Sequence, residues 1–244
     1  MRLLRLSLAL FAVPLLSTAA TAQQAKPAAK AAPRPAPKPA TARDWRAHVV
    51  QTTSGAILTG NPAAKIKLVE YLSYTCPHCG HFIAESKAPL HDDLVRRGQV
   101  RVEFRHAVRD PLDMAAALLA RCTGPKEFGS ATQAIFAAQT SWFEQGRTWW
   151  QANAESIKSQ PELAQLKAAA NGSGLSALMQ KRGMSAATID RCFAASGDLD
   201  KVTAMTKAAW ETIKGTPSFT VNGTPVAGSD WASLQPQLRA AGAR

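Results

Sequence analysis

A Cys-x-x-Cys motif joins a predicted strand directly to a predicted helix, and this junction constrains the fold more than any other feature of the chain. Residues 64–74 read AKIKLVEYLSY, an apolar and β-prone run that predicts a largely buried strand. A helical pattern follows from Pro77 to about Gly98, and alternating apolar and polar residues in 99–108 predict a second strand with one solvent-facing side. A strand, a helix and a strand with such short connections predict a βαβ unit.

The chain between this unit and its last thirty residues has a different character. From Asp110 to about Lys214, Ala- and Leu-rich stretches punctuated by Gly, Pro and Ser predict several short helices. Strand character returns in residues 216–226, where Asn222-Gly223 predicts a hairpin turn, and a closing helix follows. The sequence therefore predicts an α/β fold in which a small α/β unit is interrupted by an inserted all-helical domain.

The first 22 residues have the pattern of a cleavable signal peptide. Arg2 and Arg5 precede an apolar run over residues 6–16, and Ala20-Thr21-Ala22 supplies small residues for cleavage before Gln23. The run is shorter than the ~20 apolar residues of a membrane span. We therefore expect export, with an uncleaved signal acting as an anchor as the alternative.

Residues 23–46 have the composition of a disordered tether. They are almost entirely Ala, Pro and basic residues, a composition that cannot bury enough apolar surface to fold. This segment and the signal peptide carry eight of the 29 basic residues, so the net charge of +12 falls to +5 from residue 47 onward. The remaining excess is modest, and basic and aromatic residues are not interleaved, so no nucleic-acid partner is expected.

Four chemistries compete for the Cys-x-x-Cys motif, Cys76 to Cys79. A c-type haem site needs His directly after the second cysteine, where this chain has Gly80. A structural zinc site needs further ligands, and Cys122 and Cys192 lie 70 residues apart, so neither a metal nor a cofactor is expected. A structural disulfide across two residues removes little entropy from the unfolded chain. A redox-active dithiol is the favoured interpretation.

The position of the motif at a helix start supports redox chemistry. Pro77 suits the first helical position, which makes Cys76 the N-cap residue. We expect the Cys76 thiolate to accept hydrogen bonds from the first-turn amides, and His78 to favour this thiolate further. Cys79, three residues on, is placed to attack Cys76 in a mixed disulfide. A stabilised thiolate favours the reduced form, so the disulfide form is expected to oxidise a substrate.

The order of these elements, with VEYLSYTCPHC and GTPSFTVNG as the specific matches, resembles the DsbA family of thiol:disulfide oxidoreductases. The likeness covers roughly residues 47–241 and implies a thioredoxin fold interrupted by an inserted all-helical domain. Together with the signal peptide (1–22) and the tether (23–46), the expected segments are a first thioredoxin-like segment (47–110), a helical insertion (111–198) and a second thioredoxin-like segment (199–244).

The resemblance also implies a function. Cys76 is the implied nucleophile and Cys79 the resolving thiol of a periplasmic oxidase, whose substrates are unfolded or folding exported proteins with free thiols. A quinone-linked, DsbB-like membrane protein is the implied re-oxidase, and a monomer is expected. One rival is an isomerase or reductase kept reduced by a membrane electron donor. Another is a redox-inactive peptide-binding chaperone, which the intact cysteine pair disfavours.

Further site residues follow from the resemblance alone. Pro217 matches a cis-proline that faces the motif and, with Thr216, binds substrate in extended form, the alternative being an ordinary trans turn proline. The best-known strong oxidases have valine where this chain has Thr216, whose hydroxyl is available to a sulfur. Glu70 matches a buried acid that relays a proton, the alternatives being an exposed strand edge or a lysine pair. Several DsbA-like proteins carry a second disulfide, which implies a Cys122–Cys192 bridge, with buried free thiols as the alternative.

Overall fold

The computed structural model describes residues 43–244, so the predicted signal peptide and all but the last four residues of the predicted tether lie outside the described residues. The helices and strands of this region are, in order, η1 (Trp45–Ala47), β1 (Val49–Gln51), β2 (Ile57–Thr59), β3 (Ile66–Leu72), α1 (Pro77–Ser86), η2 (Lys87–Val95), β4 (Val100–His106), α2 (Pro111–Cys122), α3 (Pro125–Ala137), α4 (Gln139–Ile157), α5 (Glu162–Gly172), α6 (Leu175–Lys181), α7 (Ala186–Cys192), α8 (Gly197–Thr212), β5 (Ser218–Val221), β6 (Thr224–Pro225) and α9 (Trp231–Ala240).

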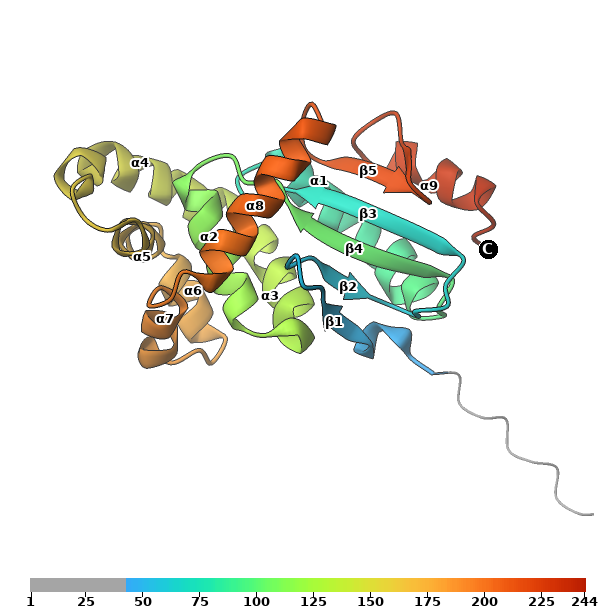
Figure 1. Ribbon diagram of the computed structural model, residues 1–244, viewed down its shortest axis with the longest axis horizontal. Helices are drawn as coiled ribbons and strands as arrows, with labels where there is room; N and C mark the ends of the chain where they lie inside the picture. Colours follow the sequence, from blue (N-terminus) through green and yellow to red (C-terminus); the bar gives the residue numbers. More distant parts are fainter. Residues whose placement is uncertain (1–42) are drawn as a thin grey trace, which may run out of the picture. The chain divides into compact units, whose positions relative to one another are not determined.

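The strands of the described chain form one six-stranded sheet in the order β1-β2-β4-β3-β5-β6 (Figure 1). Only β3 and β4 pair in parallel, which confirms the predicted βαβ unit, and all other neighbours pair antiparallel. The late hairpin completes the sheet as predicted, because β5 pairs with β3 and places Phe219 opposite Glu70. Segments about 150 residues apart in sequence thus become neighbours at the centre of the sheet.

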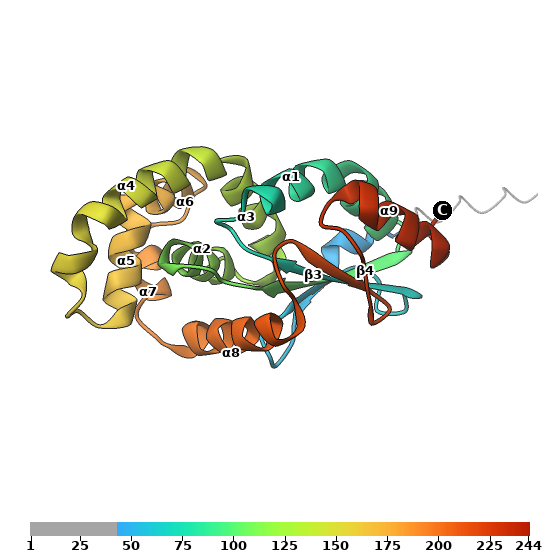
Figure 2. The same ribbon diagram turned by 90° about the horizontal axis from the view of Figure 1, so that it is seen from above.

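Helices cover both faces of this sheet (Figure 2). On one face, Ala209 of α8 and Ile213, just after it, pack against Tyr71 and Ala107. On the other face lie α1, α3 and α9, and the Phe82 ring of α1 contacts the Phe219 ring of β5 with 4.5 Å between centroids. The two faces of β3 are therefore both buried, as expected for a central strand that pairs in parallel.

The beginning of the described chain differs from the sequence-based expectation. The predicted tether extends to residue 46, but Trp45 already lies in the short helix η1 and donates its backbone N–H to the Arg96 carbonyl at 3.1 Å. Arg46 pairs with Asp44 and Asp92 at 2.6 Å each. These contacts to a distant helix hold the segment in place, and no local composition rule detects them. The β1–β2 hairpin was also not predicted, because its three-residue strands carry too short a pattern.

The predicted long helix after the motif is present but changes its winding. It is α-helical to Ser86 and continues as a π-helix, η2, through Val95. Pro89 lies within η2 and has no N–H to donate to the preceding turn, which gives a physical reason for the wider winding. The widened turn carries His91, which lines a pocket together with Glu70 of β3.

Helices α2 to α7 form the insertion, at the left of Figure 1. The implied Cys122–Cys192 bridge is present, with a Cα–Cα distance of 5.6 Å, and it joins the ends of α2 and α7. Beside it, buried Arg121 donates to the Gly55 carbonyl at 2.7 Å and pairs with Asp198 of α8 at 2.7 Å. The insertion is thus tied both within itself and to the sheet unit.

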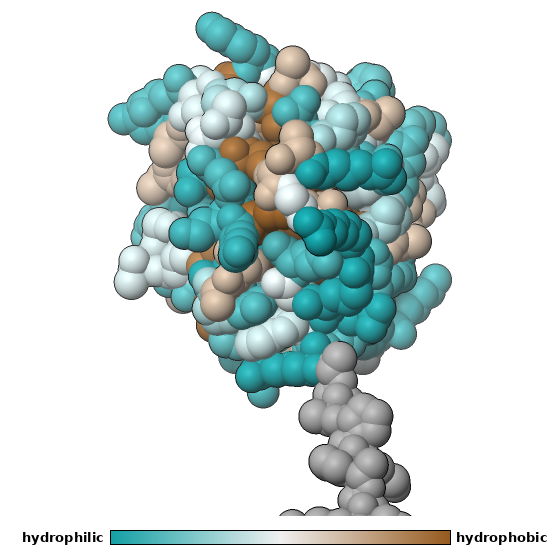
Figure 3. Space-filling view, turned by 90° about the vertical axis from the view of Figure 1, so that its right-hand side faces the viewer, coloured by the Kyte–Doolittle hydropathy of each residue, from teal (hydrophilic) through white to brown (hydrophobic). Residues whose placement is uncertain are grey.

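The sheet end that carries the C-terminus presents a mostly hydrophilic face with apolar side chains gathered in its middle (Figure 3). Among residues 43–244, no helix combines the length and apolarity that a membrane crossing requires.

Candidate active site

Both cysteines of the motif lie at the start of α1 and are free thiols. Cys76 is the N-cap residue with extended backbone angles (φ −92°, ψ 116°), and Pro77 occupies the first helical position as predicted. Cys79 faces inward and is fully buried, whereas 3% of Cys76 remains exposed. The sulfur nearer to solvent is therefore that of Cys76, in keeping with a nucleophilic Cys76 and a resolving Cys79.

The Cys76 sulfur does not make the N-capping hydrogen bond that the sequence predicts. The Cys79 N–H donates instead to the Cys76 carbonyl at 3.1 Å. The Cys76 sulfur approaches the Thr216 carbonyl oxygen, to which its thiol donates at 3.1 Å. This contact brings Thr216, which is distant in sequence, to the sulfur at the start of α1.

The loop before β5 faces the motif. The Thr216–Pro217 peptide bond is cis, and Thr216 lies against Cys76 although 140 residues separate them. On the outer side of β5, strand β6 begins to pair only at Thr220, and Val226 donates to the Phe219 carbonyl. The pairing with β6 thus leaves the backbone of residues 216–218 free on that side.

The two thiols have opposite pKa shifts. The pKa of Cys76 is lowered from 9.0 to about 5, chiefly by the hydrogen bond from the Cys79 thiol, with the Thr216 side chain and the positive charge of Arg109 contributing. Burial raises the pKa of Cys79 well above 9.0. At neutral pH the site therefore holds one thiolate, on Cys76, and one thiol, on Cys79.

A buried carboxylate holds the loop that leads into the motif. Asp113 of α2 accepts hydrogen bonds from the Ser73 hydroxyl at 2.5 Å, the Tyr74 N–H at 2.7 Å and the Arg109 N–H at 3.0 Å. Asp110, the N-cap of α2, accepts from the Thr75 hydroxyl at 2.6 Å. The first turn of α2 thus fixes the three residues before Cys76.

A side-chain amide from the helical insertion holds the same loop from the other side. Gln139, the first residue of α4, donates to the Tyr74 carbonyl at 2.7 Å and to the Cys76 carbonyl at 2.8 Å. Its oxygen lies so close to Gly80 that a Cβ there would approach it to 2.7 Å. The residue after the motif therefore has to be small.

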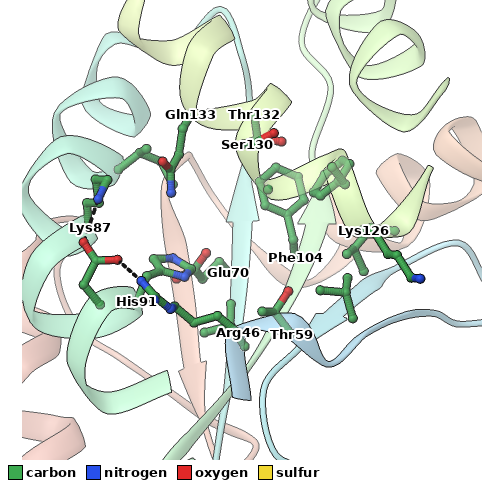
Figure 4. A pocket seen from close by; sticks show the side chains of 17 residues that line it. Arg46, Thr59, Glu70, Lys87, His91, Phe104, Lys126, Ser130, Thr132 and Gln133 are labelled. Atoms are coloured by element: carbon green, nitrogen blue, oxygen red, sulfur yellow. Dashed lines mark hydrogen bonds and ion pairs between the residues drawn. The ribbon is translucent and has the colours of Figure 1, made fainter. Parts of the chain in front are cut away.

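Glu70 lies in the central strand β3, on the face that α1 covers, and 1% of it is exposed. It lines a pocket of about 370 Å³ whose other residues come from η1, α1, η2, α3 and the strands β1, β2 and β4 (Figure 4). Burial raises the pKa of Glu70 to about 8, and within the described chain its Oε1 has no hydrogen-bond partner. The structure thus agrees with a buried acid, and contradicts both an exposed edge and a lysine pair.

His78 is exposed on the first turn of α1. Within the described chain it makes no hydrogen bond to Cys76, so its predicted effect on the thiolate stays a prediction. The described residues contain no cluster of three or more His, Cys, Asp or Glu side chains that would suit a metal ion.

Three positioning residues escaped the sequence analysis: Arg109, Asp113 and Gln139. Asp113 carries a weak local signal, since Asp110-Pro111 marks a helix start and places Asp113 in its first turn. Gln139 and Arg109 carry none, because their contacts to the motif exist only once the helical insertion has packed beside α1.

Comparisons with known proteins identify the family to which the chain belongs. The profile of a family described as "Thioredoxin" matches residues 52–240. A solved structure described as a protein-disulfide isomerase from Novosphingobium aromaticivorans is 38% identical, covers 75% of this chain and 95% of its own, and superposes with a TM-score of 0.70. Wolbachia pipientis α-DsbA1, 22% identical over 75% of this chain and 88% of its own, shares the fold with a TM-score of 0.54.

Curated relatives match over a shorter stretch. A Rickettsia bellii protein provisionally named a protein-disulfide oxidoreductase is 32% identical over 68 residues, which are 28% of this chain and 26% of that protein. The chain thus spans about a quarter of the length of this relative. The family profile covers well over half of the chain. The chain therefore belongs to the thioredoxin family, and it shares the fold of α-DsbA1.

Proposed function

We propose that the protein oxidises cysteine pairs of exported proteins by donating its Cys76–Cys79 disulfide. The observation that carries the proposal is the pair of opposite pKa shifts, with Cys76 lowered to about 5 beside a fully buried Cys79. A thiolate of low pKa stabilises the reduced dithiol, and a stable product makes the disulfide a stronger oxidant.

The reaction proceeds in two exchanges. A client thiolate attacks the Cys76 sulfur, forms a mixed disulfide and displaces the Cys79 thiolate, which takes up a proton. A second client thiolate then attacks the client sulfur of the mixed disulfide and releases the Cys76 thiolate. Two electrons pass from the client to the protein, the client gains a disulfide, and the protein is left with one thiolate and one thiol.

The free backbone beside the motif supports binding of extended clients. Residues 216–218 continue β5 toward Cys76, and their outer side is not paired with β6. Strand addition at a sheet edge uses main-chain hydrogen bonds, so it accepts clients of many sequences. A client held there has its cysteine next to the Cys76 sulfur.

Glu70 is the proposed source of the proton for the Cys79 thiolate. Its pKa of about 8 keeps Glu70 protonated at neutral pH. Its Oε1 has no hydrogen-bond partner among the described residues and faces a pocket through which the carboxylate is re-protonated. Replacing Glu70 with Gln removes the titrating group but keeps the shape. We expect slower formation of the mixed disulfide, loss of a titration near pH 8 in the rate profile and an unchanged Cys76 pKa. An unchanged rate profile would refute the relay.

The proposed compartment is the periplasm, since residues 1–22 have the pattern of a signal peptide. There a quinone-linked, DsbB-like membrane protein would accept the two electrons from the reduced dithiol and restore the disulfide. Trapping free thiols in cells and resolving the Cys76–Cys79 pair by mass tests the direction: a mainly oxidised pair supports an oxidase.

Isomerisation is the second candidate, because the Novosphingobium aromaticivorans relative, 38% identical, is described as a protein-disulfide isomerase. An isomerase has to be kept reduced, so the two functions predict opposite redox states in cells. In vitro, the oxidised protein should form disulfides in a reduced model protein faster than the reduced protein rearranges a scrambled one. The reverse ranking, together with a reduced pair in cells, would favour the isomerase.

A further inference from the structure

A second hollow lies beside the redox helix, on the side that faces the helical insertion. Its volume is about 780 Å³. It is bounded by α1 and the start of η2 on one side, by α3 and the start of α4 on the other, and by Arg182 just after α6. We call it the α1–α3 groove. Pro77 and Gly80 line it, so its inner end adjoins the cysteine motif.

The groove is a separate surface from the backbone edge at residues 216–218. Neither Thr216 nor Pro217 lines it, whereas Gln139, which holds the opposite side of the motif, does. A client held at the backbone edge with its cysteine at Cys76 therefore has a neighbouring segment within reach of this groove.

The ionisable side chains that line the groove are all basic. Its lining contains Lys87, Arg182 and His81 but no Asp or Glu side chain. Lys87 pairs with Asp92 at 2.6 Å, outside the lining. Arg182 donates to the Ser130 hydroxyl at 3.0 Å and forms no ion pair with any described residue. The Arg182 charge at the rim is therefore uncompensated.

The floor between these charges is apolar, built from Ile83, Ala84, Ala134, Phe136 and Ala137. Lys87, Ser130 and Gln133 lie where the groove meets the Glu70 pocket and line both hollows (Figure 4). An apolar floor under a cationic rim suits an extended peptide that carries carboxylates beside small apolar side chains.

We propose that the α1–α3 groove binds an acidic segment of a client protein next to the cysteine that Cys76 attacks. This inference rests on the proposed function, because it concerns which clients the same site prefers. Its consequence is selectivity: among clients with equally accessible thiols, those with a carboxylate-rich segment near the cysteine react fastest.

The test compares three synthetic dithiol peptides that differ only in a short flank of Glu, Gln or Lys residues. Second-order rate constants for their oxidation by the oxidised protein are measured at low and at high ionic strength. We expect the Glu-flanked peptide to react about fivefold faster than the Gln-flanked one at low salt, and the preference to vanish at high salt. The Lys-flanked peptide should be slowest.

Two charge reversals in neighbouring positions supply the matched control. Arg182→Glu places a carboxylate at the rim, and it should abolish or reverse the preference. Lys181→Glu changes the net charge equally, but Lys181 does not line the groove, so this variant should retain the preference. Oxidation of dithiothreitol, which is too small to occupy the groove, should be the same in both variants and the wild type.

The outcomes separate the groove from the proposed function. Equal oxidation rates for the three peptides, or an equal loss of the preference for the Glu-flanked peptide in the two variants, would refute the role of the groove in client selection. Either result would leave the proposed oxidase function intact. Failure to oxidise any peptide or dithiothreitol would instead overturn the proposed function. If Arg182→Glu changed the sedimentation of the protein without changing peptide preference, the groove would be an interface between copies, and the inference would be wrong.

Discussion

The pH dependence of the Cys76–Cys79 redox potential gives the sharpest test of the site. Lowering the Cys76 pKa from 9.0 to about 5 affects only the reduced form, because the disulfide does not titrate. The stabilisation of the reduced form is therefore fully present above pH 9, declines as the pH falls from 9 to 5, and is lost below pH 5. The potential should record this change directly.

The magnitude follows from the protonation equilibrium. At pH 7, a thiol with a pKa of 9.0 is about 1% ionised and one with a pKa of 5 is about 99% ionised. The equilibrium constant for forming the reduced protein therefore increases about 100-fold. For a two-electron couple this corresponds to about 60 mV, since a tenfold change is about 29.6 mV. Solvent reaches part of the Cys76 sulfur and screens its interactions. We therefore expect the redox potential to shift by about 30 to 60 mV toward more oxidising values.

The slope of the potential against pH is a second readout. Below pH 5 reduction takes up two protons, for a slope of about 59 mV per pH unit. Above pH 5 Cys76 stays ionised and only Cys79 takes up a proton, so the slope falls to about 30 mV per pH unit. Equilibration with glutathione between about pH 4 and 8, followed by acid quenching and chromatography, measures both slopes.

Two variants check the cause. Cys79→Ser keeps a hydroxyl donor to the Cys76 thiolate, whereas Cys79→Ala removes the largest cause of the lowered pKa. Thiolate absorbance should therefore titrate at higher pH in Cys79→Ala than in Cys79→Ser. A single slope of about 59 mV per pH unit over the whole range, or equal titrations in the two variants, would refute the reasoning.

Three further predictions concern other regions of the structure. Cys79→Ser should accumulate mixed disulfides with exported proteins on a non-reducing gel and Cys76→Ser none; the reverse pattern would exchange their roles. Replacing both Cys122 and Cys192 with Ala should lower stability by about 4 kcal/mol in chemical denaturation and leave exchange at Cys76 intact, and a large loss of exchange would contradict a structural role. Gln139→Ala removes two hydrogen bonds to buried carbonyls and should cost about 2 to 4 kcal/mol, while raising the pKa of Cys76; unchanged thiolate absorbance would show that Gln139 acts on stability alone.

Local features of the chain were predictable where short-range sterics decide them. Pro77 has a backbone angle that suits the first helical position, so Cys76 is the N-cap in any fold that keeps this helix. Asn222 and Gly223 adopt positive φ values of 51° and 84°, the conformations that these residue types tolerate best in a two-residue hairpin. The strand before the motif could be predicted from the sequence because both of its faces are buried.

The family resemblance predicted three features that periodicity alone does not indicate. The pairing of Cys122 with Cys192, the cis bond before Pro217 and the burial of Glu70 all depend on segments that meet only in the folded chain. Composition and spacing left each of them with an ordinary alternative.

Only the tertiary structure decided which residues from outside the first helical turn surround the Cys76 sulfur. The chief cause of the lowered Cys76 pKa, the Cys79 thiol, lies within the first helical turn. The sulfur also lies against Thr216, 140 residues away, while Gln139 and Asp113 hold the loop behind it. The physical reason is that desolvation and hydrogen bonds between distant segments depend on which side chains packing brings together. Helix starts and turns are set within a few residues, whereas the electrostatic environment of a sulfur is set by the whole fold.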